Sequence, residues 1–153
     1  MKIIVFDLSK CTGCRLCEIV CAVKHEGVSS PLFSRIKMLK RYEAVFAPAR
    51  CRQCEEPICV IACPLNAISK DKMLGIIKID HDKCRGCKVC MELCPYGGIY
   101  MHPIKRKVMA CDLCDGDPEC VKVCSGKALS YIEEHEAIYK IKREDIFKFF
   151  IAK

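Results

Sequence analysis

Residues 84–95 read CRGCKVCMELCP, a run in which four cysteines are separated by two, two and three residues and a proline follows the last. This three-plus-one spacing is the one with which bacterial ferredoxins bind [4Fe–4S] clusters. In that arrangement three thiolates hold one cubane, and the fourth, on a starting helical turn, reaches a neighbouring cluster. The stretch therefore predicts a cluster-binding loop.

The same arrangement recurs until every cysteine is used. All 16 cysteines of the 153-residue chain fall into four groups of four, with a longer gap before the third cysteine in groups two and four. The groups are Cys11, Cys14, Cys17 and Cys21; Cys51, Cys54, Cys59 and Cys63; Cys84, Cys87, Cys90 and Cys94; Cys111, Cys114, Cys120 and Cys124. A cubane takes four thiolates, so the count predicts four [4Fe–4S] clusters with no ligand left over.

Zinc sites and disulfides are the other common uses of clustered cysteines. Zinc sites usually join two cysteine pairs that lie a dozen or more residues apart, whereas here the third and fourth cysteines follow closely. A disulfide scaffold needs a secretory context, but only Ile3–Phe6 is apolar before Asp7, too short for a signal-peptide core. No apolar stretch approaches the length of a membrane span. We therefore expect a reduced, cytoplasmic compartment.

The formal net charge of +7 at pH 7 would ordinarily suggest a nucleic-acid or membrane surface as a partner. That count treats every cysteine as neutral. An oxidised [4Fe–4S] core with four thiolates has a charge of about −2, so four clusters bring the chain close to neutrality. The basic residues are expected to balance the cluster charge, and no nucleic-acid partner is predicted.

Internal repeats indicate how the groups are arranged. Residues 3–11 match residues 76–84, each a β-branched run followed by Asp, Lys and a cysteine loop, which predicts strands at 3–6 and 76–79. Residues 59–68 match residues 120–129 in the same way. The first group thus resembles the third, and the second resembles the fourth. Further strands are predicted within 35–42 and at 137–141.

These repeats predict an α+β fold of two ferredoxin-like units, one inserted into the other, within a single compact domain, 1–153. Between groups two and three lie a helical turn, a turn at 71–75 and a strand, which is the layout of a two-cluster ferredoxin. Residues 47–95 would form the inserted unit, and residues 1–46 with 96–153 the outer unit. The rival pairing, group one with two and three with four, fits the tandem repeat but leaves the strand pattern unused.

The first pairing assigns each fourth cysteine to a neighbouring group. Exchange of the fourth ligand would force two clusters to lie close together, as rapid electron transfer requires. The four ligand sets are Cys11, Cys14, Cys17 with Cys124; Cys111, Cys114, Cys120 with Cys21; Cys51, Cys54, Cys59 with Cys94; and Cys84, Cys87, Cys90 with Cys63.

The rest of the sequence contains no catalytic constellation. There is no Gly-x-Gly-x-x-Gly run, no phosphate loop and no nucleophile–base pattern, so we predict an electron carrier that is not itself an enzyme. His25, His81, His102 and His135 are scattered and are interpreted as surface or core residues. The apolar tail at 146–151 is expected to pack against the core.

With four residues before Cys59 and five before Cys120, the groups resemble those of four-cluster iron–sulfur subunits of the dimethyl sulfoxide reductase type. The resemblance covers about residues 1–130 and rests on Cys11-Thr12-Gly13-Cys14-Arg15-x-Cys17-Glu18 and Cys51-x2-Cys54-Glu55-x-Pro57-x-Cys59. It implies the pairing of group one with four and of two with three, in agreement with the repeats.

The resemblance also implies a partner. Members of the family relay electrons between a catalytic oxidoreductase subunit, often pterin-containing with tungsten or molybdenum, and an external acceptor or a further redox subunit. The short chain is most similar to the compact small subunits of tungsten aldehyde oxidoreductases. A hydrogenase, formate dehydrogenase or carbon monoxide dehydrogenase partner is the alternative, as is a diffusible polyferredoxin or a zinc-based binding module.

Overall fold

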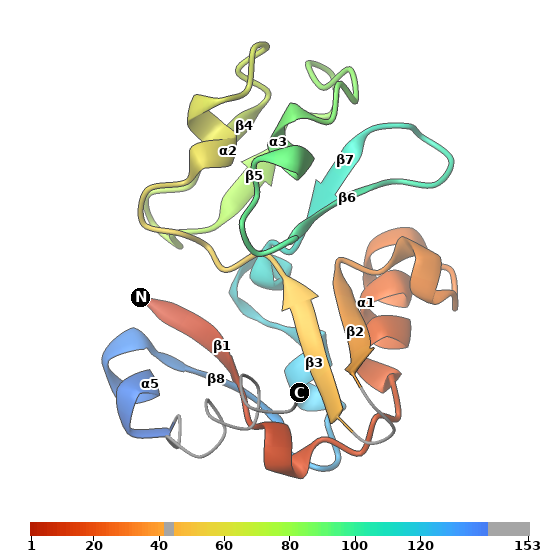
Figure 1. Ribbon diagram of the computed structural model, residues 1–153, viewed down its shortest axis with the longest axis vertical. Helices are drawn as coiled ribbons and strands as arrows, with labels where there is room; N and C mark the ends of the chain where they lie inside the picture. The colour runs from red at the N-terminus through yellow and green to blue at the C-terminus, as the bar shows by residue number, and fades with distance from the viewer. Residues whose placement is uncertain (42–44, 141–153) are drawn as a thin grey trace.

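A computed structural model describes residues 1–41 and 45–140 (Figure 1). The strands are β1 (Lys2–Phe6), β2 (Ile36–Arg41), β3 (Val45–Arg50), β4 (Ile68–Lys70), β5 (Ile77–Ile79), β6 (Ile99–Met101), β7 (Val108–Ala110) and β8 (Leu129–Glu133). The helices are α1 (Leu16–Glu26), α2 (Ile58–Ile61), α3 (Val89–Glu92), α4 (Glu119–Lys122) and α5 (Glu134–Lys140), and 3-10 turns lie at Leu8–Lys10, Pro31–Phe33 and Leu113–Gly116. Short helices thus alternate with short strands, an α+β composition.

The strands form four separate antiparallel pairs. β2 pairs with β3, β4 with β5, and β6 with β7, and each pair lies between one cysteine group and the next along the chain. β1 pairs with β8, in register from Lys2 opposite Glu133 to Phe6 opposite Leu129. This last pair joins the beginning of the described chain to its end, so that group four lies next to group one.

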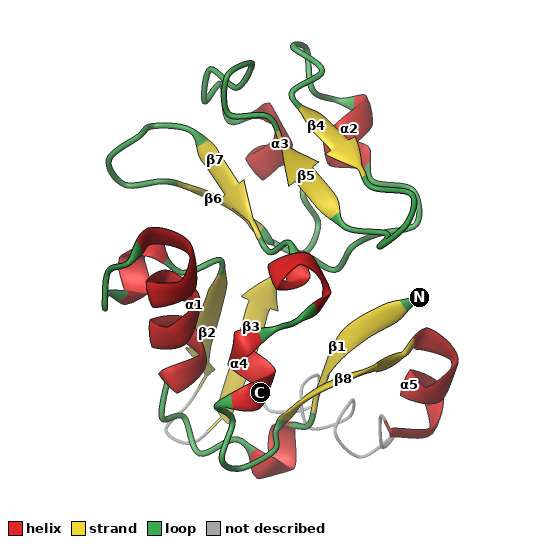
Figure 2. Ribbon diagram, turned by 180° about the vertical axis from the view of Figure 1, so that it is seen from behind, coloured by secondary structure: helices red, strands yellow, loops and turns green. Residues whose placement is uncertain are grey.

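The elements gather into two lobes (Figures 1 and 2). In one lobe α2 packs against α3, and β5 lies beside β7. In the other, α1 packs against α4 and β2, and α5 covers the β1–β8 pair. The division into units at 46/47 and 95/96 stays a prediction. The β6–β7 hairpin follows the second boundary in sequence, yet it lies beside β5.

Most of the predicted strands are present, and one prediction was wrong. The strands predicted at 3–6 and 76–79 are confirmed as β1 and β5, and the 35–42 stretch contains β2. Residues 137–140 of the strand predicted at 137–141 are instead in helix α5, whose first turn contains Glu134 and Glu136, and residue 141 lies outside the described residues. Strand β8 already pairs with β1 in the place that the predicted strand would have taken. The predicted packing of the 146–151 tail lies outside the described residues.

The hydrophobic core is narrow and is shared between aliphatic side chains and cysteines. Ile4, Ile36, Ile76, Ile77 and Leu113 are almost fully buried, and cysteines from all four groups pack among them. No helix in the described ranges is long and apolar enough to cross a membrane. Because the aliphatic core is so thin, ligation of the cysteines is expected to supply much of the folding free energy.

Helix α1 is the longest helix and holds the first cysteine loop against β2. It begins after Arg15, in the left-handed region at φ 60°, and ends at Gly27 at φ 69°. Glu18 is only 1% exposed: one carboxylate oxygen accepts the Met38 N–H at 3.0 Å, and the other pairs with Arg15 Nε at 2.6 Å. One side chain therefore joins the helix, the strand and the loop.

Replacing Glu18 with alanine is expected to destabilise the protein by about 1–3 kcal/mol, because it leaves the buried Met38 N–H without an acceptor. The guanidinium chloride midpoint for loss of the visible cluster absorbance measures this effect. Glu18→Gln keeps an acceptor oxygen and should lose less, and Glu56→Ala, at an exposed position, is the matched control. A Glu18→Ala midpoint equal to that of Glu56→Ala would contradict the role assigned to Glu18.

Candidate iron–sulfur centres

Each cysteine loop turns back on itself at the same position. The residue just before the second cysteine has a positive φ in all four groups: 70° at Gly13, 57° at Gln53, 68° at Gly86 and 55° at Leu113. Left-handed residues within such a loop make successive N–H groups converge on a concave anion-binding surface. A cluster with its thiolates is an anion, so these loops have the backbone shape that it requires.

The fourth cysteine of each group also receives a backbone hydrogen bond. Four amides donate to the fourth cysteines, at 3.2–3.3 Å: Arg35 N–H to Cys21 Sγ, Ala67 to Cys63, Gly98 to Cys94 and Ala128 to Cys124. In groups two, three and four the donor is four residues after the cysteine, one residue before a strand. In group one, α1 continues past Cys21, so the donor comes from the segment before β2. Hydrogen bonds to sulfur favour the thiolate and tune cluster potentials.

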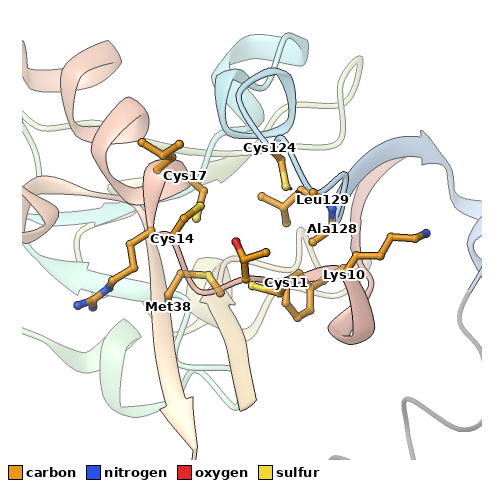
Figure 3. A pocket seen from close by; sticks show the side chains of 13 residues that line it. Lys10, Cys11, Cys14, Cys17, Met38, Cys124, Ala128 and Leu129 are labelled. Atoms are coloured by element: carbon orange, nitrogen blue, oxygen red, sulfur yellow. Dashed lines mark hydrogen bonds between the residues drawn. The ribbon is translucent and has the colours of Figure 1, made fainter. Parts of the chain in front are cut away.

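The structure brings together cysteines from groups one and four. Cys11, Cys14 and Cys17 line one pocket with Cys124, although more than a hundred residues separate them from it in sequence. The pairing of β1 with β8 creates this proximity, because the group-four turn leads directly into β8. In Figure 3 the side chains of Cys14, Cys17 and Cys124 point toward a common space bordered by Met38 and Leu129.

A second pocket contains cysteines from groups two and three. Cys84, Cys87 and Cys90 line it with Cys63, and Ile68 and Val108 close it with apolar surface. The contact of α2 with α3 places Cys63, which follows α2, beside the group-three loop. The arrangement of three cysteines from one loop and one from another group is the same as in the first pocket.

The remaining eight cysteines also gather across group boundaries, as their electrostatics show. Burial, with smaller contributions from the Cys94 and Cys54 thiolates, raises the pKa of Cys59, and Cys94 acts on Cys51 in the same direction. Burial and then the charges of Cys111 and Cys21 raise the pKa of Cys120. The backbone agrees: Gly98, whose N–H donates to Cys94 Sγ, lies against the Cys51 nitrogen, and α1, which contains Cys21, packs against α4, which contains Cys120.

Burial keeps several of these thiols protonated in the absence of metal. It raises the pKa of Cys17 and Cys111 to about 12 and that of Cys51 and Cys90 to about 11. Thiolates are the form that binds metal, so ligation at neutral pH must release these protons. All sixteen cysteines are free in the structure, and the donor set of thiols, loop amides and apolar walls suits iron–sulfur clusters.

His25, which the sequence gave no reason to connect with a cysteine, lies against group four. Its Nε2 is 3.7 Å from Cys114 Sγ and 3.5 Å from a carboxylate oxygen of Asp112, which also pairs with Arg35 at 2.5 Å. Burial keeps the pKa of His25 below its usual range. His25 is on α1, far from Cys114 in the sequence, so no local sequence pattern could have linked the two residues.

Gln53 joins the two lobes, and no sequence motif singled it out. It is 2% exposed, and its Nε2 donates to the Cys111 carbonyl at 2.5 Å while its Oε1 accepts the Ile77 N–H at 2.7 Å. Groups one and three have glycine at the equivalent left-handed position. A non-glycine residue where two related loops have glycine was the available signal of a special role.

Replacing Gln53 with alanine is expected to cost about 1–3 kcal/mol for each of the two buried partners left unpaired, the Ile77 N–H and the Cys111 carbonyl. Asn66→Ala is the matched control, because Asn66 is exposed and has a positive φ of 48°. The guanidinium midpoints of the holo-proteins compare the two changes. Similar losses in both variants would mean that the hydrogen bonds across the lobes contribute little.

Two protein-family profiles match the chain. A profile described as a 4Fe-4S dicluster domain matches residues 42–134, and one described as a 4Fe-4S binding domain matches residues 3–28. The chain belongs to the 4Fe–4S dicluster family. This family membership supports [4Fe–4S] clusters as the cofactors, rather than zinc or disulfides.

Related proteins have electron-transfer names. The polyferredoxin-like subunit of aliphatic sulfonate oxidoreductase from Pyrococcus furiosus is 41% identical over 122 residues, covering 79% of this chain and 70% of that protein. The putative electron transport protein YsaA of Escherichia coli is 38% identical, covering 86% and 90%. The NADH-dependent phenylglyoxylate dehydrogenase subunit beta of Aromatoleum evansii is 41% identical, but this chain matches only 30% of its length.

A solved structure has a similar fold. A chain in the active site complex BamBC of benzoyl coenzyme A reductase, in complex with benzoyl-CoA, is 26% identical with a TM-score of 0.51 and covers 98% of this chain and 91% of that one. Together these similarities identify the chain as an iron–sulfur electron-transfer protein, polyferredoxin-like, of the kind found as subunits of oxidoreductase complexes.

Proposed function

We propose that the chain binds four [4Fe–4S] clusters and relays electrons between a catalytic oxidoreductase subunit and an external acceptor or further subunit. The observation on which this rests is two pockets, each lined by three cysteines of one loop and one cysteine of another group. The influence of Cys94 on Cys59 and of Cys21 on Cys120 supports two further sets of the same kind. The proposed ligand sets are those predicted from the repeats, with Cys124, Cys21, Cys94 and Cys63 as the fourth ligands.

The influence of each set's charges on its neighbour supports a linear order of the sets. Cys17 is among the charges that raise the pKa of Cys120, and Cys59 among those that raise the pKa of Cys90, after burial in both cases. Together with the packing of α1 against α4 and of α2 against α3, this supports adjoining sets in groups one and four and in groups two and three. Across the lobes, Gln53 joins the group-two loop to Cys111. The order along the relay would be the group-one, group-four, group-two and group-three sets.

When bound, each cluster would supply a one-electron redox centre whose potential depends on its protein surroundings. The chain provides the rest of the function. Its loops fix the cysteines, amides such as those of Ala67 and Ala128 donate hydrogen bonds to sulfur, and apolar side chains such as Met38 and Leu129 limit access of water. Relatives named as electron transport proteins or as a polyferredoxin-like subunit support a non-catalytic role.

A catalytic partner is the more specific part of the proposal. Two of the relatives are named as subunits, one of aliphatic sulfonate oxidoreductase and one of phenylglyoxylate dehydrogenase, and the similar solved chain is from an active site complex. By resemblance we propose that the partner is a tungsten or molybdenum pterin subunit that oxidises aldehydes. The electron transport protein HydN of Escherichia coli, 32% identical and 90% covered, supports a diffusible polyferredoxin as the second candidate.

Anaerobic purification from the native source, with all bound proteins retained, tests both parts of the proposal. Iron, sulfide, tungsten, molybdenum and nickel are measured, and co-eluting chains are identified by mass spectrometry. Four clusters require about 16 iron atoms per chain and as many sulfides; a value near half would exclude them. Tungsten or molybdenum in the complex would support the pterin partner, nickel would indicate a hydrogenase or carbon monoxide dehydrogenase, and iron alone would favour the free carrier.

A further inference from the structure

A buried arginine lies between the two lobes. Arg50 is the last residue of β3 and only 4% exposed. Its Nη1 donates to the Cys51 carbonyl at 2.9 Å, and its Nη2 donates to the Ile4 carbonyl. The side chain thus extends from the group-two loop of one lobe to β1 of the other.

The Arg50 guanidinium has no acidic partner among the residues that the structure describes. Within residues 1–41 and 45–140, Arg50 forms no ion pair with Asp or Glu, whereas Arg15 pairs with Glu18 and Arg35 with Asp112. The two carbonyls satisfy hydrogen bonds but have no net charge to offset the cation. A buried charge without a counter-charge is costly, and arginine keeps its proton in proteins. Among the described residues, the negative groups that can offset this charge are the cysteine thiolates near Arg50.

The cysteines whose charges act on Arg50 belong to two different groups. Burial lowers the pKa of the guanidinium, while the thiolates of Cys111, Cys120 and Cys51 act to raise it. Cys111 and Cys120 belong to the group-four set, and Cys51 belongs to the group-two set. Gln53, three residues along, contacts Cys111 as well, so the two middle sets of the proposed relay meet at this point.

We propose that Arg50 is the shared counter-ion of the two central clusters and that it holds both of their reduction potentials above the values they would otherwise have. This inference rests on the four-cluster relay and on its ligand sets. Reduction adds one electron to a cluster without adding a proton to the guanidinium, so the site becomes more negative by one charge. A fixed positive charge nearby stabilises the reduced form, and it acts strongly because little water screens it.

The consequence for the relay concerns the step between lobes. An electron that passes from one lobe to the other would occupy the two clusters that adjoin Arg50. A counter-ion common to both clusters raises their reduction potentials together, so electron transfer between them stays close to thermoneutral. Both clusters are then easier to reduce than they would be without Arg50. Arg50 thus acts on the clusters through its charge, and it does not contact a substrate.

The test is a redox titration of the anaerobic holo-protein, followed by electron paramagnetic resonance with dithionite and mediators. Signals are assigned to clusters by their loss in Cys54→Ala and Cys114→Ala. In Arg50→Gln we expect the equilibrium constant for reduction of each central cluster to fall at least tenfold, which lowers its reduction potential by about 59 mV for one electron. The potentials of the two outer clusters should not change. Arg50→Lys keeps the charge and should restore most of the shift.

Arg52→Gln is the matched control. Arg52 is in the same loop, but it is exposed and lies over the Tyr96 ring, so solvent screens its charge and its loss should change the potentials little. Central potentials in Arg50→Gln that stay at wild-type values, or that shift no more than in Arg52→Gln, would overturn the proposal. An equal shift of all four clusters would do the same.

The iron content of the Arg50 variants also tests the proposal. If Arg50→Gln loses iron while Arg50→Lys retains it, the charge itself is required, which supports the proposal; if both lose iron, the guanidinium has only a structural role and the proposal fails. Iron content of the wild-type protein separates this question from the relay. Fewer than four clusters in the wild type would refute the relay, whereas four clusters with unshifted potentials would refute only the role of Arg50.

Discussion

Replacing Cys11 and Cys124 together is expected to remove no more iron than replacing either one alone. The two side chains line the same pocket, so on the proposed ligand sets each variant loses the same cluster. Alanine is the substitute of choice because a serine hydroxyl could stand in for the thiolate. From about 16 iron atoms per chain in the wild type, loss of a whole cluster would leave about 12 in each single variant and about 12 in the double variant.

The comparison that distinguishes the two pairings is Cys11→Ala combined with Cys63→Ala. On the proposed sets these residues belong to different clusters, so their losses should add, as expected for independent sites. On the rival pairing of group one with group two, Cys63 would be the fourth ligand of the group-one cluster, and this double variant would be the non-additive one. Non-additivity decides the question even if a variant loses only one iron of a cluster.

Replacing Gly98 with alanine is expected to disrupt the site that contains Cys51 and Cys94. A Cβ at this position would lie 2.5 Å from the Cys51 nitrogen and 2.6 Å from the Arg50 carbonyl carbon, both backbone atoms that cannot rotate away. The Gly98 N–H also donates to Cys94 Sγ at 3.3 Å. Any shift that relieves the clash therefore moves two proposed ligands of one cluster.

The related loops show that alanine itself suits this backbone conformation. Ala67 and Ala128 occupy the equivalent positions after Cys63 and Cys124, and each makes the same N–H to sulfur contact. Only the close approach of the β3 end excludes a side chain at Gly98. We expect a loss of at least about 1–3 kcal/mol, the usual cost of overpacking, together with loss of up to one cluster.

Iron analysis and the guanidinium midpoint measure the effect of Gly98→Ala, with Gly97→Ala as the control. Nothing lies within 4 Å of a Cβ at Gly97, although its φ of +55° makes alanine cost about 1–2 kcal/mol. Gly98→Ala should be worse in stability and should alone lose iron. If the two variants behave alike, the close approach of Arg50 and Cys51 is not what requires glycine.

Local repeats gave the strands that feed the cysteine loops, and they failed where pairing over a long distance was involved. β1 and β5 were predicted because a β-branched run, an Asp and a Lys precede a cysteine loop in both places. The run predicted as a strand at 137–141 has similar residues, but its residues 137–140 are in α5, and the Glu134 N–H donates to the Met1 carbonyl at 2.9 Å. Strand propensity gave way to a tertiary contact with the first residue.

By itself, the sequence determined the chemistry of this protein: four thiols in each of four loops, the spacing of iron–sulfur ligands, and the strands and turns beside them. These follow from local geometry, because a cubane and its loop span only a few residues. The tertiary structure alone decided which side chains meet between loops. Arg50 against the Ile4 carbonyl, Gln53 between Cys111 and Ile77, and His25 against Cys114 join segments that are far apart in the chain. Such contacts depend on how distant segments pack within and between the two lobes, and no short-range pattern specifies that.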